Sequence, residues 1–361
     1  IEGEKSWRFD FTLDEEANGF LMVPYVTEGT LQPRTLKAPS RRIDLQRGYR
    51  YHNSRLMDSY SADNLTGFGT YGVVAFDWPI IVPYAPQYSN YVEPGGTYEL
   101  MVTTTDQKPC LYVLGNEGGK TLDLNLYFAG ASGIKAEDAA TDPDLQAAIQ
   151  RLEHIYEKVG VQVGEIRYRS LPQEVVDKYT RVTSREEAHR LMAHGEPPSK
   201  QLAGHLSVDV FLVSDLSVRR SGSGDVLGMS AGIPGAGGLH GHARNGLVFE
   251  TKDLGHENKH VGHIMAHEIG HFLGLRHTTE IVHDTRRGDQ IDRVLGDTDP
   301  IKDTPVCDDI YEKLQEGNPF GCGDFGNLMF PMAPPPRLMQ DPRLSTGQGK
   351  AMKKNPLITS R

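Results

Sequence analysis

The sequence contains few cysteines, no long apolar run and no cluster of basic residues. Three cysteines in 361 residues cannot form a disulfide framework, so the fold must depend on a hydrophobic core. The apolar stretch 73–84 is interrupted by Asp77, Pro79 and Pro83, well short of the about 20 residues of a transmembrane helix. With 38 basic against 48 acidic residues, the net charge of −10 argues against nucleic acid and anionic lipid as main partners.

Short alternating apolar runs separated by glycine, proline and asparagine occupy residues 1–118, which we predict to form an all-β sandwich or jelly-roll domain. Its role is open: it binds substrate or a cell-surface glycan, or it is a propeptide that covers a cleft. The flexible segment 117–120 marks the predicted boundary to a second domain, 119–361. The expected strands are 7–13, 20–26, 71–76, 80–84, 98–103 and 110–114.

The pattern after the boundary alternates between strands and helices. Residues 122–128 predict a strand with one apolar face, and 143–159 predict a helix with Asp142 as its N-cap. Further strands are expected at 161–168, 206–213 and 247–250, and a helix around 264–273. This order indicates an α/β layer with a mixed sheet.

The segment 267–277 carries the strongest chemical signal. His267 and His271 are four residues apart, so on a helix both imidazoles project from one face. Gly274 lets the helix end in a left-handed cap, and the bend returns His277 as a third nitrogen ligand. Three neutral imidazoles with a fourth position left to water suit a catalytic Zn²⁺. Glu268 points to the adjacent side, where it can act as general base in peptide hydrolysis.

Two simpler interpretations compete with this one. A lone histidine is usually structural, but three histidines, a glutamate and a glycine at fixed offsets are not expected by chance. His263 precedes His267 by four residues and offers a rival pair, which lacks both the glutamate and the glycine bend. The alternative function is a binding or adhesion protein with a structural or inactive zinc site; the intact Glu268 disfavours it.

The eleven residues of this segment resemble the extended zinc motif of the metzincin metallopeptidases. That resemblance implies a zincin-like α+β catalytic domain with a mixed sheet, an active-site helix and a Met-turn. The segment 327–331 is similar to the Met-turn, which places Met329 beneath the three imidazoles. Several metzincins have a tyrosine two residues after this methionine; Pro331 stands there instead, so the oxyanion-stabilising residue is not identified.

Within the metzincins, the chain most resembles the pappalysin family over about residues 121–356. The resemblance rests on Thr278, the segment 303–307, Cys322 before the Met-turn, and the tail 344–348. It implies a secreted or periplasmic endopeptidase that cleaves proteins or peptides. The chain begins with Ile1 and shows no leader, so we expect a processed or shortened chain whose signal peptide has been removed.

The cysteines fit this reading. Cys307 and Cys322 are 15 residues apart, and a bridge between them would contribute about 3 kcal/mol to stability by loop-closure entropy. The resemblance implies the same bridge. Cys110, in a strand-like run, is expected to be a small buried hydrophobe. The alternative is a cysteine switch, in which its thiolate occupies the fourth position of zinc.

Nine glycines lie between residues 221 and 246. In the metzincin arrangement this segment supplies the sheet edge that pairs with substrate, and glycines allow close approach of a peptide; a mobile surface loop is the alternative. His240 and His242 are expected to be exposed polar residues, with a second zinc site as the alternative. The predicted substrate edge strand comprises Leu227, Gly228, Met229, Ser230, Ala231 and Gly232.

Residues 280–309 carry nine acidic and four basic side chains. Such a loop repels itself unless a cation neutralises it, and hard oxygen ligands suit Ca²⁺. Pappalysin-like enzymes use calcium near this position, so the resemblance implies a structural calcium site, with a solvated acidic loop as the alternative. Its predicted ligands are Asp297, Asp299, Asp303 and Thr304.

Overall fold

The structure is a computed structural model that describes thirteen stretches of the chain. They are residues 4–26, 29–45, 67–68, 79–83, 85–105, 107–196, 206–218, 226–279, 282–283, 294–295, 299–307, 309–335 and 340–360. The predicted strand 71–76 and the predicted calcium ligand Asp297 lie outside them. None of the helices in these stretches is long and apolar enough to cross a membrane.

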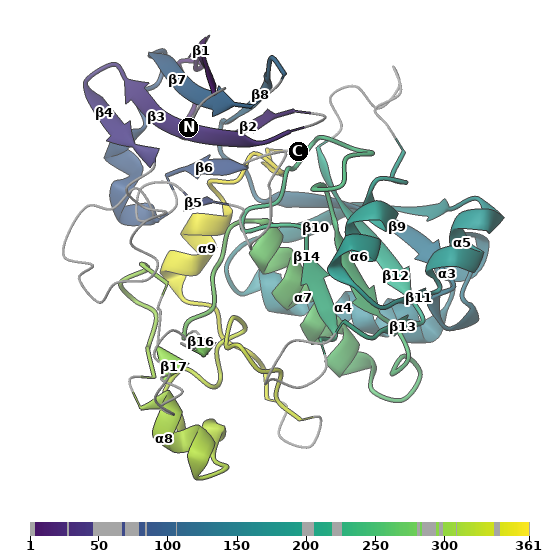
Figure 1. The fold of residues 1–361 in the computed structure, drawn as a ribbon. Coiled ribbons are helices and arrows are strands. Elements are labelled where there is room, and N and C mark those ends of the chain that lie inside the picture. The colour runs from purple at the N-terminus through teal and green to yellow at the C-terminus, as the bar shows by residue number, and fades with distance from the viewer. Residues whose placement is uncertain are drawn as a thin grey trace.

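The N-terminal part forms two antiparallel four-stranded sheets, at the top of Figure 1. Their inner faces share a core that includes Phe20 and Tyr98, and the ring of Phe11 stacks on Tyr98. The first sheet has the order β1 (Lys5–Thr12), β7 (Thr97–Thr104), β3 (Leu31–Ala38), β4 (Arg41–Asp44). The second has the order β5 (Gly67–Phe68), β6 (Ile80–Val82), β2 (Gly19–Tyr25), β8 (Cys110–Asn116). A two-sheet packing of this kind agrees with the predicted sandwich.

Strands β3 and β4 were not expected from the sequence. Three of the four residues of β4 are charged. A bulge between Pro33 and Thr35 interrupts the alternation of inward and outward side chains in β3. Their pairing is set by β7 and by each other, which local patterning does not reveal.

The second part is built on a mixed six-stranded sheet. Strands β10, β9, β12 and β15 run parallel, and the short edge strand β14 is antiparallel to β15; β18 also pairs antiparallel with β9. The predicted mixed α/β layer is therefore present. The bounds are β9 (Thr121–Ala129), β10 (Gln162–Ser170), β12 (Ser207–Val213), β14 (Gly228–Ser230), β15 (Leu247–Glu250) and β18 (Ile358–Thr359).

Helices cover both faces of this sheet. On one face lie α4 (Pro143–Glu157) and α7 (Asn258–Phe272); on the other lie α5 (Gln173–Tyr179) and α6 (Arg185–Met192). The predicted cap of α4 is confirmed, since Asp142 accepts the N–H of Leu145 at 2.8 Å. Smaller elements are η1 (Pro86–Tyr91), η2 (Ala131–Gly133), α3 (Ala136–Ala139), β11 (Arg181–Val182), β13 (Asp215–Leu216), β16 (Val282–His283) and β17 (Val294–Leu295).

Besides its own core, the sandwich contributes residues to the hydrophobic core of the α/β layer. In strand β2, Phe20 and Met22 point into the sandwich, whereas Leu21 and Val23 join the core around α7 together with Ile81. Because β2 is buried on both faces, its sequence is apolar throughout rather than alternating. The predicted division at residues 118 and 119 falls between β8 and β9 and stays a prediction.

The C-terminal part lies beneath the sandwich and beside α7 (Figure 1). It contains α8 (Ile310–Gln315), η3 (Pro319–Gly321) and α9 (Thr346–Met352). The structure contains the disulfide between Cys307 and Cys322, whose sulfurs pack with Ile310 and Phe330 in a small separate core. This bridge was expected from the spacing of the two cysteines.

Candidate metal centre

Helix α7 carries two of the three predicted metal ligands. It is held in the main core by Val261, Met265, Ile269 and Phe272. The hydroxyl of Tyr156 on α4 donates to the carbonyl of Ala266 at 2.7 Å, which fastens the two helices together. The helix is therefore a rigid platform for His267 and His271.

Helix α7 ends at Gly274 in a left-handed cap, as predicted from the sequence. Gly274 has a φ of 111°, which only glycine adopts readily, and its N–H donates to the carbonyl of His271 at 2.9 Å. The N–H of Leu275 donates back to Gly270, also at 2.9 Å. The chain then reverses and brings His277 to the other two histidines.

The three imidazoles converge through their Nε2 atoms. The Nε2 of His277 lies 3.3 Å from that of His267 and 3.1 Å from that of His271. Among the described residues, these three form a group that is able to hold a metal ion such as zinc. Four ligands at about 2.0–2.1 Å in tetrahedral geometry have N···N separations of about 3.3 Å, so the spacing suits Zn²⁺.

The backbone determines which nitrogen of two rings faces the centre. The Nδ1 of His267 lies 2.7 Å from the Leu328 carbonyl, and that of His271 lies 2.7 Å from the Leu275 carbonyl. A carbonyl can only accept, so both Nδ1 atoms carry the proton and both Nε2 atoms present lone pairs. A cation placed between these lone pairs would be attracted by them and would relieve their mutual repulsion. The donor set therefore fits a zinc ion.

The turn at 327–330 lies directly against helix α7. A Cβ on Gly270 would lie 2.8 Å from the sulfur of Met329, so glycine leaves the room that this side chain fills. The Met329 carbonyl accepts the N–H of Thr278 at 3.0 Å, and Met329 is fully buried. This position is compatible with the predicted Met-turn, and the role of Met329 stays a prediction.

A buried carboxylate ties the third ligand to the disulfide. The hydroxyls of Thr278 and Thr279 both donate to Asp324 Oδ2, at 2.7 and 2.6 Å, and the N–H of Cys307 donates to Thr279 at 3.0 Å. The chain immediately after His277 is thereby fastened to the segment that the disulfide closes. Sequence reasoning missed Asp324, because no periodicity links it to residues more than 40 positions earlier.

Glu268 follows His267 on helix α7, and its side chain lies against the sheet edge. It is 9% exposed, and its Oε2 accepts the N–H of Ser230 at 2.9 Å. Ser230 belongs to β14, so the predicted segment 227–232 does include an edge strand of the sheet. Its pairing with a substrate stays a prediction.

The predicted calcium ligands are only partly brought together. Asp303 caps α9, since its two oxygens accept the Ser345 hydroxyl at 2.8 Å and the N–H of Gly347 at 2.9 Å. Asp299 is buried, and burial raises its pKa to about 7. Thr304 Oγ1 lies 3.5 Å from the Ser345 hydroxyl. In the described ranges these residues form no three-ligand group, so the calcium site stays a prediction.

Cys110 is exposed on β8, so the expectation that it is a buried hydrophobe is wrong. Its partner across the strand pair is Tyr25, and burial together with the neighbouring Cys110 raises the pKa of that tyrosine. Strand β8 is the outer strand of its sheet, which explains the exposure. Within the described stretches Cys110 is not part of the three-histidine group.

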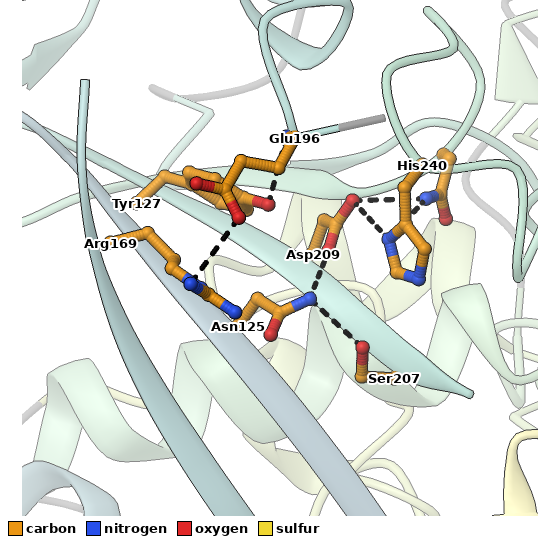
Figure 2. A network of polar contacts seen from close by, with 8 residues as sticks. Asn125, Tyr127, Arg169, Glu196, Ser207, Asp209 and His240 are labelled. Atoms are coloured by element: carbon orange, nitrogen blue, oxygen red, sulfur yellow. Dashed lines mark hydrogen bonds and ion pairs between the residues drawn. The ribbon is translucent and has the colours of Figure 1, made fainter. Parts of the chain in front are cut away.

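The expectation that His240 is an exposed polar residue is also wrong. Its Nδ1 donates to Asp209 Oδ2 at 2.8 Å on the sheet face away from α7, and both residues are buried. Figure 2 shows that Asn125 approaches the same carboxylate, donating to its Oδ1 at 2.8 Å. The ring of His242 packs instead against Tyr25. In the part of the chain that the structure describes, neither histidine joins a three-ligand group.

A cavity of about 170 Å³ lies beside His263 on helix α7. Its wall includes His263, one helical turn before His267, and Asn327 at the start of the turn that holds Met329. Phe320, Phe325 and Arg343 also line it, and Phe320 is 38% exposed. Burial lowers the pKa of His263 to about 4, with a further contribution from the positive charges nearby, so its imidazole is neutral.

Comparisons with known proteins identify no family for this chain. The sequence matches no protein-family model. No curated protein matches it. Among solved structures, it is similar to the crystal structure of metalloproteinase-II from Bacteroides fragilis, with 12% identity over 87% of this chain and 91% of that one. The TM-score is 0.27, and at this level we draw nothing about this chain from the likeness.

Proposed function

We propose that the protein is a secreted zinc endopeptidase of the metzincin type, most like the pappalysins. The observation that carries this proposal is the convergence of three imidazole Nε2 atoms, with two of the rings held by backbone carbonyls. Glu268 follows the first of these histidines on helix α7. The eleven-residue motif supports it from the sequence. The disulfide is compatible with an oxidising compartment.

In this proposal each site residue has a distinct role. His267, His271 and His277 would hold zinc, which would supply positive charge to polarise a peptide carbonyl and to lower the pKa of a water molecule. Glu268 accepts a proton from the attacking water and returns it to the departing amine. Strand β14 binds the substrate backbone by adding it to the sheet.

The test compares cleavage of casein by the wild-type protein and by Glu268→Ala. Both should bind one equivalent of zinc, and only the wild type should cut casein. Equal cleavage by the two proteins would refute the role of Glu268. Zinc binding without cleavage by either would favour the alternative, a binding protein with a structural metal site.

A structural calcium ion is part of the same proposal. Asp299 is buried, and burial raises its pKa to about 7, so a cation there would offset the cost of its charge. Thermal stability should fall on chelation and be restored by calcium but not by zinc. Indifference to calcium would leave the acidic segment as a solvated loop.

A further inference from the structure

The side chain of Glu268 is enclosed between helix α7 and strand β14. A Cβ placed on Gly228 would lie 2.5 Å from Cγ and 3.1 Å from Oε1 of Glu268. The N–H of Ser230 meets Oε2 of the same carboxylate at 2.9 Å. The strand therefore presents bare backbone at Gly228 and a hydrogen-bond donor at Ser230 to this side chain.

The hydrogen bonds of β14 place this donor on the open edge of the sheet. The Ala231 N–H donates to the Gly246 carbonyl, and the Leu227 carbonyl accepts from Glu250, both at 3.0 Å. Main-chain groups alternate in direction along a strand, so those of Gly228 and Ser230 point away from β15. The donor of Ser230 is thus a group that the ladder does not use and that Glu268 occupies.

We propose that Gly228 and Ser230 are positioning residues: together with the N–H of Ser230, the bare backbone of Gly228 orients the carboxylate of Glu268. This inference rests on the proposed function. A glutamate on a helix has three rotatable side-chain bonds. Holding Oε2 with a backbone donor fixes the plane of the carboxylate. The absence of a Cβ at Gly228 lets the side chain lie close enough to the strand for that bond to form.

Strand β14 then has two roles, binding of the substrate backbone and orientation of Glu268. An open edge offers its N–H groups to the carbonyls of an extended peptide, and such donors contribute to substrate affinity. Because Glu268 takes the N–H of Ser230, that donor serves the base rather than the substrate. Its loss should therefore lower kcat and leave KM largely unchanged.

The first experiment introduces a Cβ at Gly228. Ordinary carbon contacts are about 3.5–4.0 Å, so Gly228→Ala should displace the carboxylate by about 1 Å. A displacement of that size should lower kcat for casein-derived peptides about 100-fold, with zinc affinity unchanged. The matched control is Gly115→Ala in β8, where the nearest atoms to a new Cβ lie at 3.8 and 3.9 Å. Unchanged kcat, or a rise in KM in its place, would overturn the proposal.

The second experiment does not depend on activity. Amide hydrogen exchange is measured at Ser230 in the wild type and in Glu268→Ala, both loaded with zinc. Removing the acceptor should accelerate exchange at Ser230 by about tenfold, the equivalent of one hydrogen bond. The amide of Met229, which faces β15, serves as the internal control and should not change. Equal exchange at Ser230 in the two proteins would show that Glu268 does not hold this donor.

Ser230→Pro provides an independent variant, because it removes the N–H and proline is tolerated where that group faces away from the ladder. We expect it to lower kcat as Gly228→Ala does. The outcomes separate the two proposals. If the wild type cleaves casein but kcat resists all these changes, only the positioning role fails. If the wild type does not cleave, the proposed function fails, and the exchange experiment still tests the contact.

Discussion

Replacing Asn327 with alanine should weaken both the fold and zinc binding, because this side chain holds the turn that orients His267. Its Oδ1 accepts the N–H of Met329 at 2.9 Å, and its amide exchanges two hydrogen bonds with Gln348, at 2.9 and 3.2 Å. Asn327 and Gln348 are buried. The next residue of the turn, Leu328, supplies the carbonyl that accepts from His267.

The size of the effect follows from these contacts. Three neutral hydrogen bonds at about 1 kcal/mol each predict a loss of about 3 kcal/mol in the free energy of unfolding. A loosened Leu328 carbonyl releases the ring of His267, and loss of such an outer contact lowers metal affinity about 10- to 100-fold. Urea denaturation measures the first quantity, and competition with a chromophoric chelator measures the second.

The control is Asn125→Ala on the opposite face of the sheet (Figure 2). Asn125 is also buried and donates to Ser207 and Asp209 at 2.9 and 2.8 Å, so its removal should destabilise by about 2 kcal/mol. It lies away from the metal centre, so zinc affinity should not change. If both variants lose zinc affinity equally, the loss reflects general destabilisation, and the proposed link between Asn327 and His267 is refuted.

Three further predictions concern stability. Replacing both Cys307 and Cys322 by serine should lower the free energy of unfolding by about 3 kcal/mol, as the 15-residue loop implies; no shift in urea denaturation would contradict this. His263 has a folded pKa of about 4 against an ordinary 6.5, so the unfolded chain binds a proton between these values that the folded chain does not. Stability should fall as pH drops through this window by up to about 3 kcal/mol, and His263→Gln should flatten that slope. Leu21→Ala should lower the free energy of unfolding by about 3 kcal/mol. Because the sandwich and the α/β layer both contribute residues to the core around Leu21, tryptophan fluorescence and circular dichroism should still report a single unfolding transition. Two separate transitions would contradict this prediction.

Much of the secondary structure around the site was predictable from local pattern. The cap at Asp142, the apolar face of β9 and the glycine end of α7 each depend on residues within a few positions of one another. The local pattern did not predict the burial of the second face of strand β9. The sequence predicted one apolar face for it, yet Asn125 and Tyr127 on the other face are also buried, beneath α5 and α6 and the segment that contains His240.

The three candidate ligands and the candidate base could be predicted from the linear chain. His267, Glu268, His271 and His277 lie within eleven consecutive residues, and helical spacing places His267 and His271 on one face. What holds them comes from distant segments: the carbonyl of Leu328, the sulfur of Met329, the carboxylate of Asp324 and the N–H of Ser230. Backbone groups and single polar side chains have no periodicity that a sequence reveals. Packing of the turn and of strand β14 against α7 brings them there, and that packing depends on a core to which the sandwich also contributes.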